Sequence, residues 1–555
     1  MKPGPSVLRG GWLLAAGVGL AISCGPEGGP RTDSQTNWYR VCGSNADCGG
    51  LACLCGICTR SCENDAGCDG LGEASCVQDS IAVAVCGGRT PPSAGLCLST
   101  CDDSDCPLGQ SCVAGACRPI SDQPATVVVD PSERHQTLIG LGATLTFVEN
   151  QVVNHPRRAE LYEAMFADLG IDVLRLRNRF GYVGDDDLTT AGSIVEAATE
   201  SLGETPTLML TSWSPPAALK ASGEQECRGD VVTCTLARDQ SGEFDYVGLG
   251  VHWRASLEAY AAVGVVPDYI GIQNNPDFIP EAAVPGEGCR FLPAEGTTMQ
   301  LVNGVGVDVE YPGLSEALDA VVAELEGLES PPSIAAPETA GILSVGDYMS
   351  VLDASQLGAV AHHLYDVDPS RVNRSGLALL GDLGADLQLP LFQTEMQADG
   401  PGTSVLLHHV LVDEGAEVSL QGVLAGPASL ANVVPGMLIA MTPADYILKE
   451  PYHALRHFSR YTGPGWVRVG ATVDVEGLLV SAWIAPGEEA LTVVIVNPGL
   501  TDLDVRVDLG EFASRATSVI RTVFDGLERS AELGPLSGDG TLRVPGRAVV
   551  TVASQ

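Results

Sequence analysis

Basic residues are scarce in this sequence, and a hydrophobic run long enough to span a membrane is missing. Its 555 residues include 30 Lys and Arg against 70 Asp and Glu, which gives a formal net charge of −40. A surface this acidic repels a phosphate backbone, and this excludes nucleic acid as a partner. Hydrophobic residues make up 45% of the chain and charged residues 18%, which excludes a chain that is disordered throughout. No segment is apolar over enough residues to cross a bilayer as an ordinary helix.

The N-terminus carries the features of an export signal. Basic residues precede the apolar run 12–22, which is too short for a transmembrane helix but typical of a signal peptide. The run ends in Leu-Ala-Ile-Ser-Cys24, which resembles a bacterial lipobox and implies lipidation of Cys24. We therefore expect a lipoprotein signal peptide at 1–24, a flexible linker at 25–40, and a protein that is lipid-anchored to the bacterial outer membrane or cell surface. Ordinary signal cleavage near Ser23 is the alternative.

Cysteine is concentrated in one stretch that contains no histidine. Of the 18 cysteines, 14 lie between Cys42 and Cys117, an even number that permits seven disulfides. This stretch has too few large apolar residues to build a core, so disulfides are expected to stabilise it. Zinc is the rival interpretation because Cys55 and Cys58 have ligand spacing, but the missing histidines and the export signal favour disulfides. We expect a small disulfide-rich module at 41–118 that acts as a spacer or a protein-contact module.

From about Ala125 onward, short apolar runs alternate with segments of helix length. Eight strands separated by helices predict an α/β fold of the (β/α)₈ TIM barrel type over 125–465. An open doubly wound sheet is the alternative, but the first connection lacks the glycine-rich phosphate loop that is typical of that fold. The eight expected strands are 137–142, 171–176, 206–210, 269–272, 333–336, 357–362, 389–392 and 435–441.

The pattern changes again after the expected barrel. Over 502–509, apolar residues alternate with charged residues that are mostly acidic, and a β-branched run occupies 491–496. These features predict a C-terminal β-sandwich at 466–555. Residues 126–129 could add a strand to this sandwich from the other end of the barrel.

The catalytic face of a TIM barrel is built from the C-terminal ends of its strands. The third expected strand runs into Trp213-Ser-Pro-Pro, the fourth into Asn274-Asn275-Pro, and the seventh into Gln-Thr-Glu395. Taken in this order, the strings resemble glycoside hydrolase family 30, whose members include glucosylceramidases, xylanases and β-1,6-glucanases. The resemblance covers about 125–555 and implies a β-linked oligosaccharide or polysaccharide as the partner. The sequence shows no signature of a metal site or a cofactor.

The resemblance assigns the nucleophile of a retaining mechanism to Glu395. A retaining glycosidase needs two carboxyl groups about 5 to 5.5 Å apart, one to attack the sugar and one to protonate the leaving oxygen. The family places the second carboxyl at the position of Asn275, and an amide has no proton to donate. General acid and base catalysis is worth about 10² to 10⁴ in rate, so the substitution raises the question of activity.

Three interpretations follow from Asn275. In the first, the protein is an enzyme in which Glu338, Asp277 or Glu281 replaces the missing acid, or the substrate has a leaving group that needs no proton. In the second, the barrel is a catalytically impaired carbohydrate-binding or sensing lipoprotein, with Trp213 as a platform for a sugar ring. In the third, the resemblance reflects inheritance of the fold alone.

Other residues near the expected strand ends are candidates for the same site. Arg175 and Arg177 share one strand face, so one of them could keep Glu395 ionised or form a salt bridge inside the barrel. His363 and Tyr365 follow the sixth expected strand, where the family places residues that contact the sugar. The candidates for substrate binding are Trp213, Asn274, Arg175, His363 and Tyr365. Cys227 and Cys234 could close a loop disulfide, which leaves Cys289 unpaired.

Overall fold

A computed structural model describes most of the chain. The described residues are 38, 48–49, 51–54, 57–71, 74–78, 95–101, 106, 110–113, 116–119 and 124–554, except 186, 303, 476 and 516. The expected signal peptide with Cys24 and the linker at 25–40 therefore lie outside the described residues, apart from residue 38. The chain forms two compact units, Met1–Ser121 and Asp122–Gln555. Within the described part of the chain, no helix has the length and hydropathy that a membrane crossing requires.

The first unit consists of short hairpins joined by disulfides. The pairs Cys48–Cys58, Cys62–Cys76, Cys68–Cys97 and Cys106–Cys117 are bonded, which confirms the prediction of disulfides for these residues. Among the described residues of this unit the buried apolar clusters are small, so the covalent links supply much of the stability. The hairpins are β1 (Ala52–Leu54) with β2 (Ile57–Thr59), β3 (Ala74–Gln78) with β4 (Gly95–Ser99), and β5 (Gln110–Val113) with β6 (Ala116–Pro119); the helical turn η3 (Asp65–Cys68) precedes β3.

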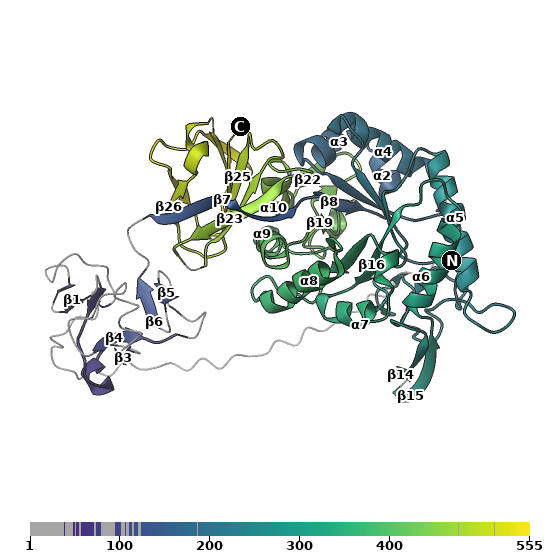
Figure 1. The fold of residues 1–555 in the computed structure, drawn as a ribbon, viewed down its shortest axis with the longest axis horizontal. Coiled ribbons are helices and arrows are strands. Elements are labelled where there is room, and N and C mark those ends of the chain that lie inside the picture. The colour runs from purple at the N-terminus through teal and green to yellow at the C-terminus, as the bar shows by residue number, and fades with distance from the viewer. Residues whose placement is uncertain are drawn as a thin grey trace, which may run out of the picture. The chain divides into compact units, whose positions relative to one another are not determined.

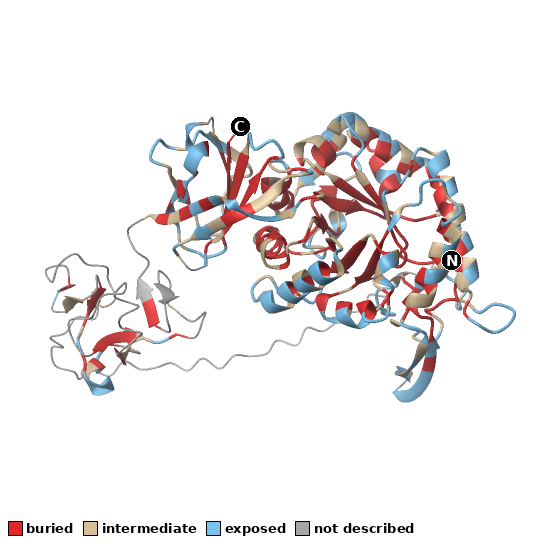
Figure 2. Ribbon diagram, in the orientation of Figure 1, coloured by how far each residue is buried: buried red, intermediate tan, exposed pale blue. Residues whose placement is uncertain are grey.

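The second unit contains a closed barrel of eight parallel strands, as predicted (Figure 1). The strands are buried and helices lie around them (Figure 2). Most of these helices have an exposed face, whereas α9 (Gly400–His409) and α10 (Glu450–Ser459) are almost entirely buried. In order round the barrel, beginning with the first in the sequence, the strands are β8 (Gly140–Leu145), β9 (Val173–Arg177), β10 (Thr207–Thr211), β12 (Tyr269–Gly271), β16 (Ser333–Thr339), β17 (Ala359–His363), β18 (Leu391–Glu395) and β19 (Val418–Gln421).

Helices and helical turns connect the barrel strands or follow the last of them. Their apolar faces pack on the strands in one large core. They are α2 (Glu149–Val153), α3 (Arg158–Tyr162) with η4 (Glu163–Asp168), α4 (Thr189–Leu202), η5 (Ala217–Leu219), α5 (Tyr246–Ala262), α6 (Leu314–Leu325), η6 (Ile342–Ser344), α7 (Val345–Met349), η7 (Ala354–Gln356), α8 (Arg374–Leu387), α9 (Gly400–His409) with η8 (Val410–Glu414), η9 (Ala428–Leu430) and α10 (Glu450–Ser459).

The eighth strand is not where the sequence predicted it. Residues 435–441 were expected to close the barrel, but β19 does so by pairing with β18 on one side and β8 on the other. Every second residue of β19 is polar. Ser419 and Gln421 are buried on the face opposite to Val418 and Leu420, which pack with Val173 and Phe392 in the barrel interior. The more apolar run ends in β21 (Ile439–Met441), which belongs to a separate sheet with β20 (Ala425–Pro427) and β22 (Tyr446–Leu448).

The C-terminal part of the unit is β-rich, as predicted. Its nine-stranded sheet encloses a core of mainly valine and leucine side chains. The first strand, β7 (Ala125–Thr137), precedes the barrel in sequence but pairs with β23 and β26 in this sheet. The remaining strands are β23 (Val467–Val473), β24 (Leu479–Ile484), β25 (Leu491–Asn497), β26 (Leu503–Asp508), β27 (Thr517–Val523), β28 (Ala531–Gly534), β29 (Thr541–Val544) and β30 (Ala548–Ser554), with the turn η10 (Gly510–Ser514) between β26 and β27.

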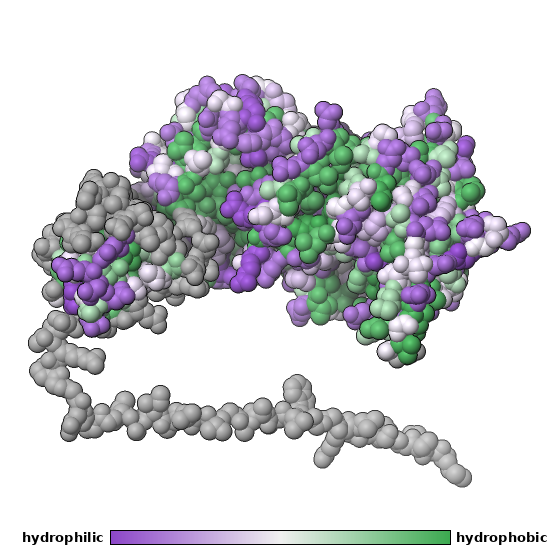
Figure 3. Space-filling model, turned by 60° about the horizontal axis from the view of Figure 1, so that its bottom comes forward, coloured by the Kyte–Doolittle hydropathy of each residue, from purple (hydrophilic) through white to green (hydrophobic). Residues whose placement is uncertain are grey.

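Two further β-ribbons come from the connections before and after the fourth barrel strand, β12. β11 (Glu226–Cys227) pairs with β13 (Gly286–Glu287), and β14 (Gly296–Val302) pairs with β15 (Val305–Tyr311). The hairpin β14–β15 extends away from the barrel (Figure 1). On the face drawn in Figure 3, hydrophilic and hydrophobic residues are both present over the barrel and the β-rich part. Of these ribbons, β11 and β13 lie at the site described next.

Candidate active site

The C-terminal ends of the barrel strands bring the predicted residues together. Glu395 is the last residue of β18 and His363 the last residue of β17. Trp213 follows β10 by two residues, and Asn274 follows β12 by three. Because parallel strands all end at the same rim, segments that are up to 220 residues apart in sequence meet here, as the contact between Arg175 and Glu395 shows.

Arg175 lies at the centre of this group and is completely buried. Its Nη1 donates to Glu395 Oε1 at 2.6 Å, and its Nη2 donates to Glu338 Oε1 and to Asn274 Oδ1, both at 2.7 Å. Its Nε donates to Thr211 Oγ1 at 3.1 Å. The planar guanidinium therefore holds two carboxylates and one amide in fixed positions. Of the two arginines on this strand, Arg175 is the one that contacts Glu395.

Glu395 is buried and stays ionised. Burial alone would raise its pKa, but His363 and Arg175 nearby and the hydrogen bond from Tyr365 outweigh burial and hold the pKa below its usual value. The hydroxyl of Tyr365 donates to Glu395 Oε2 at 2.6 Å. One oxygen of the carboxylate is thus bound by Arg175 and the other by Tyr365. A carboxylate kept anionic at the mouth of a barrel can act as a nucleophile.

His363 lies between the two carboxylates that Arg175 binds. Its Nδ1 is 3.8 Å from Glu395 Oε2, and its Nε2 is 4.0 Å from Glu338 Oε1. The ring is fully buried, and neither nitrogen has a hydrogen-bond partner among the described residues. The sequence placed His363 in the site, and the geometry adds that it faces both acids.

Aromatic side chains form the wall next to Arg175. The guanidinium carbon of Arg175 is 4.4 Å from the ring centroid of Trp213. Phe147 packs edge-on against Trp213 with a centroid distance of 6.2 Å. Trp213 is only 8% exposed, whereas Phe147 is 53% exposed. Phe147 follows β8 and was not predicted as a site residue, since one phenylalanine after a strand carries no recognisable motif.

Asn275 occupies the position where the family pattern expects a carboxyl group. Its backbone is left-handed with a φ of 48°, and its N–H donates to the carbonyl of Glu338 at 3.0 Å. The side-chain Oδ1 is buried and has no hydrogen-bond partner among the described residues. The amide group can position a ligand, but it has no proton of suitable acidity to give up.

The three substitutes that the sequence suggested do not line the cleft. Glu338 is 1% exposed, and its carboxylate is bound by Arg175 at the floor of the site. Asp277 accepts a hydrogen bond from the backbone N–H of Ala340 at 2.9 Å. Glu281 is exposed. None of the three is among the residues that line the cleft.

A cleft of about 280 Å³ opens above these residues. Two of the described residues that line it carry a carboxyl group, Glu395 and Glu287. Glu287 was not predicted, because it lies in the long connection after β12 and outside any strand-end motif. The other lining residues include Phe147, Trp213, Asn274, Asn275, Phe278, Tyr365, Gln397, Val423, Leu430 and Met437.

Arg177, two residues after Arg175, binds a different carboxylate of the cleft, that of Glu287. Its Nη1 contacts Glu287 Oε1 at 2.5 Å and its Nη2 contacts Asp185 Oδ2 at 2.6 Å. The two arginines of β9 therefore each bind one of the carboxyl groups that line the cleft. This division could not be read from the strand pattern, which places both arginines on the same face.

Comparison with known proteins gives the fold of the second unit. No family model matches the sequence, and no curated protein matches it. Solved structures do match: the catalytic domain of the GH30 xylanase C from Talaromyces cellulolyticus has 17% identity and a TM-score of 0.57, over 78% of this chain and 100% of that one. The GH30 subfamily 8 xylanase from Clostridium acetobutylicum has 16% identity and a TM-score of 0.56, over 78% and 99%.

An endo-β1,6-glucanase matches to a similar degree. It has 13% identity and a TM-score of 0.56, over 78% of this chain and 94% of that one. At such identities the likeness shows the fold alone. The second unit therefore has the glycoside hydrolase family 30 type of fold, a TIM barrel with a β-rich domain.

Proposed function

We propose that this protein is a retaining glycoside hydrolase that acts on β-linked oligosaccharides or polysaccharides, with Glu395 as the nucleophile. The supporting observation is the carboxylate of Glu395, which lines the cleft, is bound by Arg175 and Tyr365, and has a lowered pKa. An anionic carboxylate in this position can attack the anomeric carbon of a sugar bound in the cleft. The other groups of the site then serve to hold that carboxylate or to bind the sugar.

The class of substrate is inferred from the fold and from the wall of the cleft. The structurally similar proteins are named as xylanases and an endo-β1,6-glucanase, and both names denote β-linked glycans. Phe147 and Trp213 offer aromatic surface on which a sugar ring can pack. Asn274 and Gln397 add amide groups that can bond to hydroxyls of the sugar. We infer that the site binds a short stretch of a β-linked chain.

The amide at Asn275 is an observation that favours a second candidate function. Since this residue has no acidic proton, the site can be a catalytically impaired binding or sensing site that uses the same aromatic wall. In that case oligosaccharide binding is measurable but no sugar is transferred to Glu395. The experiment below separates the two functions.

The test is hydrolysis of aryl β-glycosides of glucose and xylose by the wild type and by two variants. Glu395→Gln removes the proposed nucleophile and is expected to abolish turnover. Glu281→Gln is the matched control, because this carboxyl is exposed and does not line the cleft. Equal turnover by all three proteins contradicts the role of Glu395. Binding of xylo- or gluco-oligosaccharides by calorimetry without any turnover supports the binding site instead.

We also propose that the protein is lipid-anchored through Cys24 at the bacterial outer membrane or cell surface. The disulfides of the first unit support export to an oxidising compartment. The lipobox-like string supports the anchor itself. Mass spectrometry of the mature protein is expected to show a diacylated or triacylated Cys24 as the first residue, and an unmodified Cys24 contradicts the anchor.

A further inference from the structure

The cleft contains a second carboxyl group that the family pattern does not assign. We propose that Glu287 is the proton donor and acceptor of this site and takes the role that Asn275 cannot perform; the inference rests on the proposed role of Glu395 as nucleophile. Glu287 and Glu395 are the two carboxyl-bearing residues among the described residues that line the cleft. A glycosidase of this type needs two carboxyls facing one sugar.

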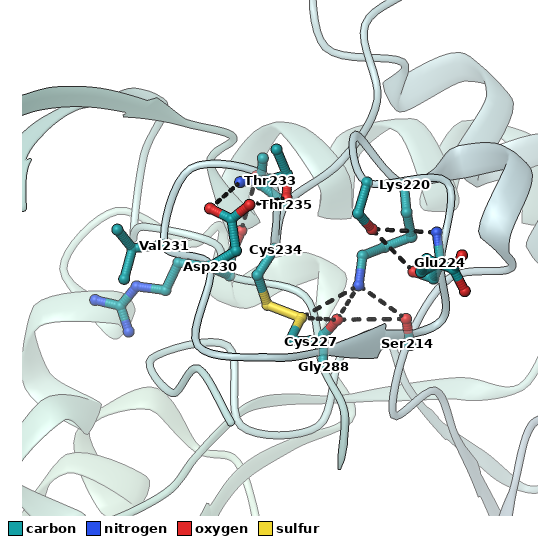
Figure 4. Close-up of a disulfide and its surroundings, with 12 residues drawn as sticks. Ser214, Lys220, Glu224, Cys227, Asp230, Val231, Thr233, Cys234, Thr235 and Gly288 are labelled. Atoms are coloured by element: carbon teal, nitrogen blue, oxygen red, sulfur yellow. Dashed lines mark hydrogen bonds between the residues drawn. A yellow bond between two sulfur atoms is a disulfide. The ribbon is translucent and has the colours of Figure 1, made fainter. Parts of the chain in front are cut away.

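Glu287 is carried by a short ribbon with a fixed position. The two-residue strand β13 pairs with β11, with Glu287 opposite Glu226 and Gly286 opposite Cys227. Cys227 is bonded to Cys234, so a disulfide ties the partner strand to the loop that follows it (Figure 4). This covalent link limits the movement of β11, the strand with which β13 and Glu287 pair.

A buried lysine holds the residue after Glu287. Figure 4 shows the ammonium of Lys220 beside the carbonyl of Gly288 and the hydroxyl of Ser214. Lys220 Nζ donates to that carbonyl, and its distance to Ser214 Oγ is 3.2 Å. Lys220 is only 3% exposed, and a buried ammonium is retained only where such partners satisfy it. The backbone next to Glu287 is therefore anchored on both sides.

The electrostatic surroundings of Glu287 differ from those of Glu395. Glu287 is bound on one side by Arg177, and its Oε2 lies 3.4 Å from the hydroxyl of Tyr182, which donates to the carbonyl of Ser214 at 2.6 Å. Arg177 is shared, because Asp185 is 2.6 Å and Glu149 3.7 Å from its guanidinium nitrogens. The charged or titratable groups that act on Glu287 are Arg177, Tyr182 and Asp185, with Lys220 beyond Gly288, whereas Glu149 acts on Arg177.

Because several carboxylates share Arg177, it lowers the pKa of each of them less than it would lower the pKa of a single partner. Burial therefore raises the pKa of Glu287 despite Arg177, whereas the pKa of Glu395 is lowered. Two acids whose surroundings move their pKa values in opposite directions are the usual arrangement for a proton donor and an ionised nucleophile. The same shift keeps the proton of Glu287 available closer to neutral pH.

The two carboxyls divide the reaction into balanced steps. In the first, an oxygen of Glu395 bonds to the anomeric carbon while the bond to the leaving oxygen breaks, and Glu287 transfers its proton to that oxygen. In the second, ionised Glu287 takes a proton from water, the water oxygen bonds to the anomeric carbon, and the bond to Glu395 breaks. Both carboxyl groups return to their starting states.

The test compares Glu287→Gln with Asp185→Asn. Both changes remove one carboxylate from Arg177, but Asp185 is 38% exposed and does not line the cleft. Glu287→Gln is expected to lower kcat/KM for phenyl β-glycosides by about 10² to 10⁴, and by less than about tenfold for 2,4-dinitrophenyl β-glycosides, which depart without a proton. Added azide is expected to restore turnover of the dinitrophenyl substrate and give a β-glycosyl azide. Asp185→Asn leaves both cleft carboxyls in place, so it is expected to show neither the selective loss on phenyl glycosides nor the rescue by azide. Because it removes a competitor for Arg177, it is expected to lower the pKa of Glu287 and to move the basic limb of the pH profile to lower pH.

Two further measurements distinguish a failure of the role proposed for Glu287 from a failure of the role proposed for Glu395. Asn275→Glu in the Glu287→Gln background places a carboxyl at the position that the family pattern uses, and is expected to recover part of the lost phenyl glycoside activity. If the wild type turns over aryl glycosides through Glu395 and Glu287→Gln behaves like Asp185→Asn, the role of Glu287 is wrong and that of Glu395 stands. If the wild type forms no covalent adduct at Glu395, the proposed function fails and this inference fails with it.

Discussion

The ionisation state of the Glu395 carboxyl group depends on three side chains around it. Arg175 binds one carboxylate oxygen, Tyr365 binds the other, and His363 lies within 3.8 Å. Each of them favours the charged form of the acid, and together they overcome the cost of burial. Activity that depends on ionised Glu395 is therefore present above its lowered pKa and is lost as the pH falls through that value.

Tyr365→Phe tests this arrangement through the pH profile. Removal of the hydroxyl takes away one donor to Glu395, so the pKa of Glu395 rises towards its usual value. The acidic limb of kcat/KM against pH is then expected to move to higher pH. Tyr446→Phe is the control, since that ring lies outside the cleft. An unchanged acidic limb in Tyr365→Phe contradicts the role assigned to the hydroxyl.

Asn275 also has a structural role that the sequence did not reveal. Its φ of 48° lies in the left-handed region, which asparagine and glycine tolerate better than alanine. Asn275→Ala is expected to be less stable than Asn275→Gly by roughly 1 to 2 kcal/mol, measured by urea unfolding. Equal stability of the two variants would mean that the backbone relaxes at this position.

At the scale of single residues, the sequence located the strand-end groups but not the rest of the cleft. Glu395, Asn274 and Trp213 follow apolar strands in strings that can be recognised. Glu287 and Phe147 do not, because their positions depend on a long connection and on a left-handed turn with a φ of 65° at Phe147. Such positions are set by tertiary contacts, which no local pattern encodes.

At the scale of elements, seven of the eight expected strands overlap strands of the barrel, and the eighth does not. The seven are apolar runs, and a strand with both faces buried is expected to be apolar. β19 has the sequence Val-Ser-Leu-Gln, and both of its polar residues are buried. Ser419 Oγ donates to Oε1 of the buried Gln393 at 2.6 Å. Hydrophobicity alone therefore pointed to the later and more apolar run.

Gly271 is the last residue of barrel strand β12 and lies beside Glu338. A Cβ at this position would lie 1.8 Å from Glu338 Oε2 and 2.7 Å from Thr211 Oγ1. Gly271→Ala is expected to displace Glu338, disturb Arg175, and cost about 1 to 3 kcal/mol of stability together with activity. The measurement is urea unfolding combined with aryl glycoside turnover.

Gly346 provides the control for that variant. It lies in α7, and a Cβ there would meet nothing within 4 Å. Gly346→Ala is expected to be neutral or to gain about 0.4 to 1 kcal/mol. Equal losses in the two variants would show that the effect at Gly271 does not arise from Glu338.

At the scale of the whole molecule, the chain separates into a disulfide-linked unit and a unit that contains the complete cleft. All residues that line the cleft lie in Asp122–Gln555. A protein of residues 122–555 is therefore expected to fold alone, with the same aryl glycoside activity and the same unfolding transition as that unit has in the full chain. Circular dichroism and calorimetry check this, and an insoluble or unfolded product would contradict it.

Trapping of a covalent adduct tests the nucleophilic role of Glu395. The wild type is incubated with 2,4-dinitrophenyl 2-deoxy-2-fluoro-β-glycosides of glucose and xylose, digested, and mapped by mass spectrometry. We expect one added fluoroglycosyl group on the peptide that contains Glu395, present in Glu287→Gln and absent in Glu395→Gln. No adduct with either sugar, or an adduct on a different carboxyl such as Glu287 or Glu338, would contradict it.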